Sequence, residues 1–432
     1  MTHSSRNSKH PLRVLIVEAY TDANIGSCAL VENSLKIIES KFKKAEIRVM
    51  AHYPQAFTDL YDKPAINDIF QYPFKQPRFR QMSWLLKTLY WMLGTFIVSR
   101  RLKHKSASSV GCSRFCEKIS PFLWADLVVS VGAERLNDNF YKNIVFSLYT
   151  YYLCKSYKKK MVLFPSTIGP FFFWWSKLLT KKVLSKVDLV YTRDQASTRV
   201  LYNELKIPSE KILNSVDVAV LQVPISKKQA HLMIRANEDE ILVGISAMRW
   251  TYFKNRIELP YSNYDAYVHE MAITADSLIS QYNLTIVFYP TNYPIHASRE
   301  DDLSTAYDIS SLITNKKKTK IITKLPTPSQ LQGMLACSQV NITTRMHACI
   351  LSTSACVPTI SINYLFKVRE YMDSLGLSDF SIDIEEFCAA WTLKAFSKIW
   401  SEREQWRTHL ENVIDQKRRL LWQSMEPLDA LV

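Results

Sequence analysis

The sequence predicts an α/β protein built from two doubly wound domains, and three observations support this. The chain has 432 residues, too many for one ordinary core and suited to two domains. Short β-branched runs alternate with helix-like amphipathic segments throughout. The runs are continuously apolar, as expected for parallel strands covered by helices on both faces.

The first half supplies one such series. Its strand-like runs are "LRVLIVEA", "EIRVMA", "DLVVSV", "KMVLFPS" and "DLVYT", and helices are expected at residues 27–42, 174–185 and 195–205. Alternation of this kind is typical of a parallel sheet with crossover helices. We therefore assign residues 1–220 to an N-terminal domain.

The second half repeats the pattern with "EILVGISA", "LTIVFYP", "KIITKL", "VNITT" and "PTISI", separated by expected helices at 264–281, 299–313, 328–337 and 346–355. The strand signal lapses in "VPISKKQAHLMIRANEDE", so residues 221–240 are predicted to be a linker. Residues 241–400 form the second predicted domain. The charged segment 401–432 is predicted to be a C-terminal helix that could cross back over the first domain.

Charge and cysteine usage narrow the function classes. The net charge of +15 favours anionic partners, but no arginine-rich tract or zinc-finger spacing accompanies it, so we expect no nucleic-acid ligand. Eight cysteines at irregular spacing favour reduced thiols over a disulfide framework. Cys112 and Cys116 lack a second ligand pair, so no metal site is expected. The expected reduced thiols, together with the lack of a signal-peptide pattern in the first 30 residues, predict a cytoplasmic protein.

One apolar segment, residues 83–99 ("SWLLKTLYWMLGTFIVS"), raises the question of a membrane. It is short for a membrane span and contains Lys87. Its flanks are basic, with Arg78, Arg80, Arg100, Arg101, Lys103 and Lys105. Two interpretations stay open: an interfacial helix on the inner, anionic face of the membrane, or an amphipathic helix packed on the sheet beside a solvated basic loop.

Ligands of doubly wound sheets bind beyond the carboxyl ends of the strands. Polar residues at those positions are therefore candidates for a site: Asn24, Glu134, Ser166, Thr167, Arg193, Asp194, Arg249, Tyr289, Arg345 and His347. Arg345 and His347 stand out because they lie between a strand and a helix-like run of small residues. A surface arginine and a hydrogen-bonded histidine near the core are the alternatives.

Several stretches, taken in order, resemble a known family. They are "ANIGSCAL", "VSVGAERL", "FPSTIGPF", "VYTRDQAS", "SVDVAV", "VGISAMR" and "TTRMHACILSTSACVPTISINYLFKVREYMDSLGL". The ordered set resembles the polysaccharide pyruvyl transferase family from Leu12 to about Leu377. The resemblance implies two Rossmann-like domains facing a cleft, as in glycosyltransferases of the GT-B type.

The resemblance also implies an activity. Such an enzyme moves the enolpyruvyl group of phosphoenolpyruvate onto two hydroxyls of a sugar in a cell-envelope polysaccharide or exopolysaccharide, forming a pyruvate ketal. The donor is a substrate and no cofactor is implied. The acceptor is a sugar or a lipid-linked oligosaccharide, and peripheral attachment to the membrane would bring the enzyme to a lipid-linked one.

Residue roles follow from the same resemblance. The donor would be held by Arg193, Arg345, Met346 through its backbone, His347 and Lys367, with Arg193, Arg345 and His347 catalytic. Guanidinium groups bind carboxylate and phosphate in a bidentate manner, a helix start adds N–H donors, and histidine suits protonation of the methylene carbon. The acceptor or cleft side would include Asn24, Glu134, Ser166, Asp217, Arg249 and Tyr289, with Glu134 the next candidate for the acid.

The sequence departs from the family pattern at a few positions. Ala23, Ser27 and Cys28 stand where a glycine and an acidic pair are usual, and Ala133 stands in a turn that is usually rich in glycine. Two other functions are compatible with the sequence. One is a nucleotide-sugar glycosyltransferase of the same fold, and the other is a catalytically silent relative that acts in polysaccharide assembly.

Overall fold

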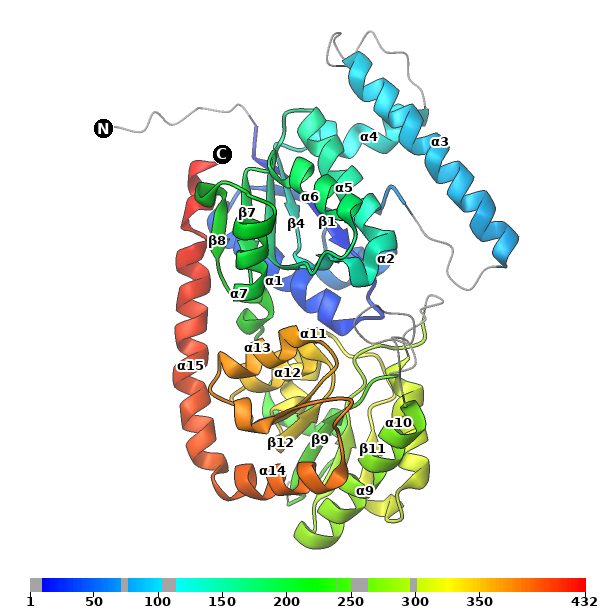
Figure 1. Ribbon diagram of the computed structural model, residues 1–432. Helices are drawn as coiled ribbons and strands as arrows, with labels where there is room; N and C mark the ends of the chain where they lie inside the picture. Colours follow the sequence, from blue (N-terminus) through cyan, green and yellow to red (C-terminus); the bar gives the residue numbers. More distant parts are fainter. Residues whose placement is uncertain (1–9, 71–76, 103–113, 238, 250–262, 296–300) are drawn as a thin grey trace. The chain divides into compact units, whose positions relative to one another are not determined.

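The computed structural model describes residues 10–70, 77–102, 114–237, 239–249, 263–295 and 301–432 (Figure 1). The chain forms two compact units. Unit 1 consists of the described parts of Met1–Thr21, Val31–Asn214 and Ser424–Val432, and unit 2 of the described parts of Asp22–Leu30 and Ser215–Gln423. Each unit contains its own sheet, so the predicted α/β class with two parallel sheets is confirmed.

Unit 1 has an eight-stranded parallel sheet. Its main path runs β3-β2-β1-β4-β6-β7-β8, and β5 pairs with β6. The strands are β1 (Arg13–Ala19), β2 (Glu46–Ala51), β3 (Ala65–Asn67), β4 (Leu127–Ser130), β5 (Ala133–Leu136), β6 (Lys160–Ile168), β7 (Leu189–Thr192) and β8 (Ile212–Asn214). The central strands are buried almost throughout, which explains why they contain no alternating polar residues.

The helices of unit 1 pack on this sheet or on one another. They are the C-terminal part of α1 (Ile25–Lys41), α2 (Pro54–Tyr61), α3 (Arg78–Leu102), α4 (Arg114–Trp124), α5 (Tyr141–Ser156), α6 (Trp174–Leu184) and α7 (Gln195–Arg199), which a π-helical turn (Val200–Glu204) continues. Phe122, Leu148 and Leu184 from α4, α5 and α6 pack on Leu15, Val128 and Leu163 of the sheet. The sequence did not predict α5, although it supplies much of this core.

Unit 2 has a six-stranded parallel sheet in the order β11-β10-β9-β12-β13-β14. The strands are β9 (Leu242–Ser246), β10 (Thr285–Phe288), β11 (Thr319–Ile321), β12 (Ser338–Thr343), β13 (Thr359–Asn363) and β14 (Ser381–Asp383). Thr343 pairs with Ser246 on one side and with Ser361 on the other. The carboxyl ends of β9, β12 and β13 are therefore level, and the turns that follow them share one edge.

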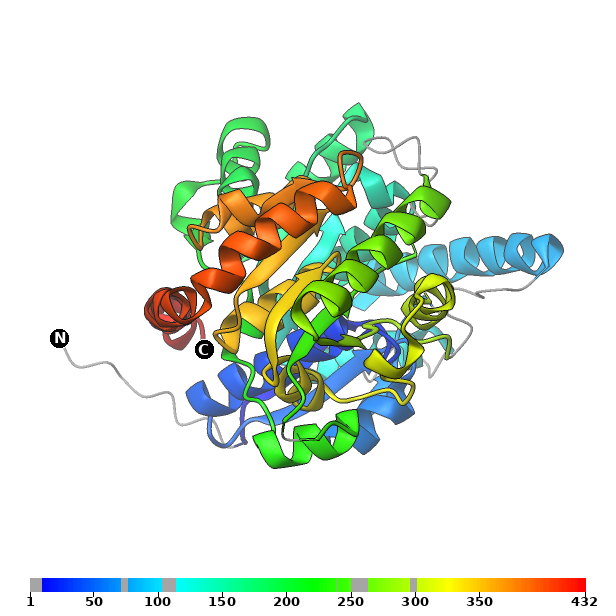
Figure 2. The ribbon, with the colours of Figure 1, turned by 90° about the horizontal axis from the view of Figure 1, so that it is seen from below.

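The helices of unit 2 pack around this second sheet. The helices are α8 (Lys227–Ile234), α9 (Tyr264–Tyr282), α10 (Asp302–Leu312), α11 (Pro328–Leu335), α12 (Met346–Ser354), α13 (Phe366–Asp373), α14 (Ala389–Ser401) and α15 (Arg403–Ser424). Ala230, Leu331 and Leu351 from α8, α11 and α12 belong to one core cluster with Leu242 and Val287. Tyr282 of α9 lies against Phe396 of α14, and Figure 2 shows these two helices side by side.

The N-terminal segment Asp22–Leu30 belongs to unit 2, which differs from the predicted assignment of all residues 1–220 to the first domain. The predicted linker 221–240 also belongs to unit 2, because it contains α8, which packs Ala230 into the core of that unit. The Ile25 N–H donates to the Thr291 carbonyl at 3.0 Å, and the Tyr293 N–H donates to the Ala23 carbonyl at 3.0 Å. Ile25 also packs into the core of unit 2. The predicted C-terminal helix is present as α15, and the residues from Ser424 onward belong to unit 1. Among the described residues, no helix is both long enough and apolar enough to span a membrane.

Candidate functional site

Arg345 lies at the junction of β12 and α12 and is held by a buried ion pair with Asp302. The guanidinium Nη2 lies 2.6 Å from Oδ1 of Asp302, and Nε donates to Oδ2 at 3.0 Å. Arg345 is 8% exposed and Asp302 is 1% exposed. The guanidinium group of Arg345 therefore already binds a carboxylate in a bidentate manner within unit 2.

Asp302 also fixes the turn after β10. Its Oδ2 accepts hydrogen bonds from Thr291 Oγ1 at 2.9 Å and from the backbone N–H of Asn292 at 3.0 Å. The backbone of Asn292 in turn forms an antiparallel bridge with Asn24. The Arg345–Asp302 pair thus connects the turns after β10 and β12 to the start of α1.

His347, the second residue of α12, lies against the start of α1. An ideal Cβ placed on Gly26 would be 2.3 Å from Nδ1 of His347, so only glycine leaves room for the imidazole in this position. Nε2 of His347 is 3.9 Å from Oδ2 of Asp217, whose other oxygen accepts from the Ala219 N–H at 2.9 Å. A carboxylate therefore lies beside a histidine that is one-fifth exposed.

The start of α12 offers backbone donors at the same place. Arg345 is its N-cap, with extended φ and ψ angles, and its side chain makes no capping hydrogen bond. The first amides of the helix point toward its N-terminus and carry the positive end of the helix dipole. Met346, which the sequence analysis assigned to donor binding through its backbone, is the first residue of this helix.

Lys367 lies at the next strand–helix junction, in the first turn of α13. Its side chain is buried, and burial lowers the pKa of its ammonium group from the usual 10.5 to about 7. The ammonium lies 5.8 Å from the centre of the Tyr364 ring. Because β12 and β13 are paired neighbours, Lys367 occupies the same edge of the sheet as Arg345 and His347.

The other predicted residues of unit 2 have different surroundings. Arg249 follows β9 and donates through Nη1 to Ser304 Oγ at 3.0 Å, and its guanidinium lies over the Tyr264 ring. Tyr289 is fully buried and donates to the Met334 carbonyl at 3.0 Å. We therefore regard Tyr289 as a core residue and leave it out of the site.

Asn24 caps the start of α1, because its Oδ1 accepts from the Ser27 N–H at 3.0 Å. The sequence predicts that Asn24 lies in the N-terminal domain, whereas the structure places it in unit 2. It therefore lies in the same unit as Arg345, His347, Asp217 and Lys367.

Unit 1 brings together a different set of polar residues at the carboxyl edge of its sheet. Arg193 donates through Nε to Thr167 Oγ1 at 2.9 Å, and Asp194 accepts from the same hydroxyl at 2.8 Å. Ser166 is buried and donates to the Phe164 carbonyl at 2.7 Å. Glu134 lies half-buried on β5.

A buried acid at the end of β1, Glu18, was not among the predicted residues. Its Oε2 accepts from Ser130 Oγ and from Tyr151 Oη at 2.6 Å, and Arg135 donates to its carbonyl at 3.0 Å. Glu18 has a φ of +69°, which is unusual for a residue other than glycine. The sequence feature that could have identified Glu18 is its position as an acidic residue at the end of the first apolar strand.

Asp68 adds a second carboxyl group that interacts with Arg135. Burial raises its pKa from 3.8 to about 6, while the positive charge of Arg135 acts in the opposite direction. Glu18, Asp68 and Arg135 therefore form a charged cluster in unit 1. Carboxylates and a guanidinium group can together donate and accept the hydrogen bonds that sugar hydroxyls need.

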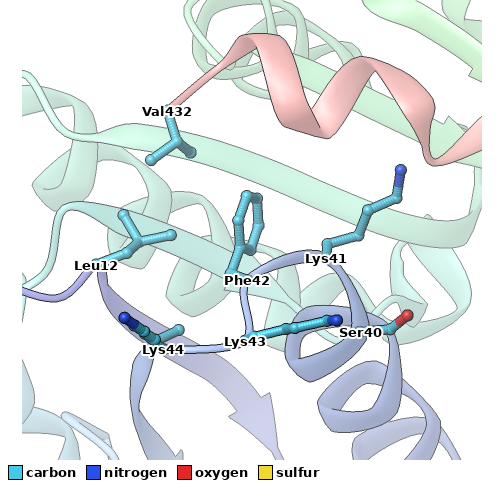
Figure 3. A pocket seen from close by; sticks show the side chains of 8 residues that line it. Leu12, Ser40, Lys41, Phe42, Lys43, Lys44 and Val432 are labelled. Atoms are coloured by element: carbon cyan, nitrogen blue, oxygen red, sulfur yellow. The ribbon is translucent and has the colours of Figure 1, made fainter. Parts of the chain in front are cut away.

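A shallow pocket lies in unit 1 at the end of α1, away from these clusters (Figure 3). Its volume is about 490 Å³, and it is lined by Leu12, Ser40, Lys41, Phe42, Lys43, Lys44, Ala45 and Val432. Lys41 is engaged by Asp429 at 2.8 Å. The pocket contains none of the predicted site residues, and apolar side chains form its centre, so we do not assign the function to it.

The chain is similar to known proteins in sequence and in fold. The chain is 20% identical to the amylovoran biosynthesis protein AmsJ of Erwinia amylovora, over 95% of this chain and 97% of that one. Among solved structures it resembles the UDP-GlcNAc 2-epimerase of Neisseria meningitidis, with a TM-score of 0.57, 11% identity and coverage of 97% and 99% of the two chains. A glycosyltransferase of Rickettsia africae has a TM-score of 0.53 and 11% identity, with coverage of 96% and 99%.

The two solved structures are too distant in sequence to indicate more than a common fold. The family evidence is more specific. The family model described as polysaccharide pyruvyl transferase matches residues 24–365, which include Asn24, Arg193, Arg345 and His347, while Lys367 lies just beyond the match. Because the match covers most of the sequence, the chain belongs to the polysaccharide pyruvyl transferase family.

Proposed function

We propose that this protein transfers the enolpyruvyl group of phosphoenolpyruvate to two hydroxyls of a sugar in a cell-envelope polysaccharide or exopolysaccharide, forming a pyruvate ketal. The observation that carries the proposal is the edge of unit 2 where His347 and Arg345 begin α12 and Lys367 begins α13. Family membership and the relative named for amylovoran biosynthesis support the same class of acceptor.

In the proposed reaction, a proton adds to the methylene carbon of the donor, and a first sugar hydroxyl adds to the neighbouring carbon. The bond from that carbon to the phosphate ester oxygen breaks, and the second hydroxyl closes the ketal. The two sugar hydroxyls release two protons. One of them returns to the acid that protonated the methylene carbon, and the other leaves with inorganic phosphate.

In this mechanism His347 supplies the proton to the methylene carbon. The nearby Asp217 carboxylate, 3.9 Å from the ring, stabilises the positive charge that the ring carries before transfer. Gly26 leaves room for the imidazole, because a side chain there would displace it. Positioned acid catalysis of this kind contributes about 100-fold to 10,000-fold in rate.

The donor's carboxylate and phosphate need cationic and N–H partners. Lys367 and the first amides of α12 supply these from unit 2, since the negative charge of a bound donor favours the protonated form of Lys367. Arg345 fixes the turn through Asp302 and adds positive charge at the same edge. The predicted role of Arg193 in donor binding stays a prediction, because Arg193 lies in unit 1.

A ligand titration tests the donor. Thermal unfolding is followed with phosphoenolpyruvate, with UDP-N-acetylglucosamine and with inorganic phosphate, because a ligand that binds only the folded protein raises its stability. We expect phosphoenolpyruvate to raise the midpoint more than equimolar phosphate does. A shift with the nucleotide sugar alone would instead indicate a glycosyltransferase, and no shift with either would favour a catalytically silent relative.

A further inference from the structure

Helix α3 exposes a continuous apolar face, which we call the outer face. It consists of Phe79, Met82, Leu85, Leu86, Leu89, Tyr90, Leu93 and Ile97. Phe79 is 69% exposed, Leu86 63% and Leu93 61%. Successive members are mostly three or four residues apart, so they lie along one side of the helix over about 27 Å at 1.5 Å per residue.

The opposite side of α3 already packs on unit 1. The Trp84 and Trp91 rings lie 5.5 Å and 5.0 Å from those of Phe146 on α5 and Phe115 on α4. Thr95 Oγ1 is 2.7 Å from Tyr149 Oη. A surface helix normally has one apolar face and one polar face, whereas α3 is apolar on both. Attachment of α3 to unit 1 therefore does not account for the outer face.

The charges around the outer face are predominantly positive. The sequence of α3 contains no aspartate or glutamate, and Arg80, Lys87 and Arg100 are exposed. Two basic residues of α4 lie over rings of α3: Arg114 over Tyr90 and Lys118 over Trp91. The side chains of Arg78 and Arg101, and residues Lys103 and Lys105, lie outside the described residues.

We propose that the outer face of α3 binds the surface of an anionic phospholipid bilayer, with its apolar side chains inserted between lipid headgroups. Leucine and aromatic residues flanked by basic ones characterise helices that lie in the membrane interface. Each basic residue near an anionic surface adds to the attraction, which distinguishes this partner from a neutral or basic protein surface. The proposal concerns unit 1 alone and does not depend on the donor or on the acceptor.

Flotation of the full chain with vesicles tests the proposal. We expect recovery with phosphatidylcholine vesicles that contain phosphatidylglycerol, much less recovery with phosphatidylcholine alone, and a decrease at high salt. Leu86→Glu combined with Leu93→Glu should lower the partition coefficient at least about tenfold for each substitution. The matched control is Leu232→Glu with Leu312→Glu, because both leucines are exposed on unit 2, and it should float like the wild type.

The thermal midpoint of the Leu86→Glu/Leu93→Glu variant should equal that of the wild type, since both side chains are exposed. Equal recovery with anionic and neutral vesicles, or none with either, overturns the proposal. It is also overturned if light scattering shows a dimer that the same double substitution dissociates, because the outer face would then be an interface between copies of the chain.

Discussion

The Nη2 atom of Arg345 lies 2.6 Å from Oδ1 of Asp302, 43 positions earlier in the chain, and both residues are buried. This pair joins the turn after β10 to the start of α12. Two roles therefore meet in Arg345: it fixes the local fold, and it contributes positive charge at the edge where we place the donor. Any substitution at Arg345 affects both roles, so a substitution at Asp302 examines the structural role more directly.

Asp302→Asn should destabilise unit 2 strongly. Removal of one partner of a buried ion pair leaves an uncompensated buried charge, which costs about 3 kcal/mol or more. Chemical unfolding measures the change in free energy. Asp379→Asn is the control, because its partner Lys398 is also at the surface and little change is expected there. Equal stability of the two variants would show that Asp302 does not hold Arg345 in solution.

His347→Gln should lower turnover by about 100-fold to 10,000-fold while phosphoenolpyruvate still binds. Glutamine preserves hydrogen bonding but cannot serve as an acid near neutral pH. Release of inorganic phosphate measures turnover, and isothermal calorimetry measures donor affinity. His269→Gln, at an exposed position on α9, is the control. A His347→Gln variant with nearly full turnover would make the histidine structural and would direct attention to Glu134.

Gly26→Ala should lower turnover, although alanine is the better helix former by about 1 kcal/mol. The new Cβ would lie 2.3 Å from Nδ1 and 2.6 Å from Cγ of His347, so the ring must move. In the His347→Ala background only the Cβ contact at 2.9 Å remains, and the stability penalty of Gly26→Ala should shrink. A double-mutant cycle by thermal unfolding measures the difference, and additive effects would contradict the contact.

Lys367→Met should remove a pH dependence of stability. In the folded protein the Lys367 pKa is about 7, against 10.5 when the group is solvated. Between these values the unfolded chain binds a proton that the folded chain does not. The free energy of unfolding of the wild type should therefore rise with pH relative to the variant, by at most about 1.4 kcal/mol per pH unit.

Urea unfolding at pH 7, 8 and 9 measures the Lys367 effect. Lys228→Met is the control, because Lys228 is exposed on α8 and should show no such difference from the wild type. Parallel pH profiles for the wild type and Lys367→Met would show that the Lys367 ammonium is solvated.

Ala133→Gly should stabilise unit 1 by about 1 kcal/mol. Ala133 has a φ of +103°, a backbone conformation that costs residues with a Cβ about 1–2 kcal/mol. Ala56→Gly in α2 is the opposite control, since glycine in a helix costs about 1 kcal/mol relative to alanine. Thermal unfolding of both variants measures the change. A loss of stability at both positions would mean that Ala133 is not strained.

Local sequence patterns determined the class of the fold and the position of the candidate site. Apolar runs alternating with helical segments predicted both parallel sheets, because the period of buried strands and helices is a local property. The junctions after strands predicted where Arg345, His347 and Arg193 would lie. The same patterns identified segment 83–99 as unusual, and the structure shows this part of α3 with one face packed and one face exposed.

Tertiary structure alone decided which residues meet at those junctions. The pairing of Arg345 with Asp302, the contact of His347 with Gly26 and the inclusion of Asn24 in unit 2 all join segments far apart in the chain. Tyr289 follows a strand as a site residue would, yet packing encloses it in the core. Such contacts, and the burial that lowers the pKa of Lys367, depend on how distant elements pack, which no local period specifies.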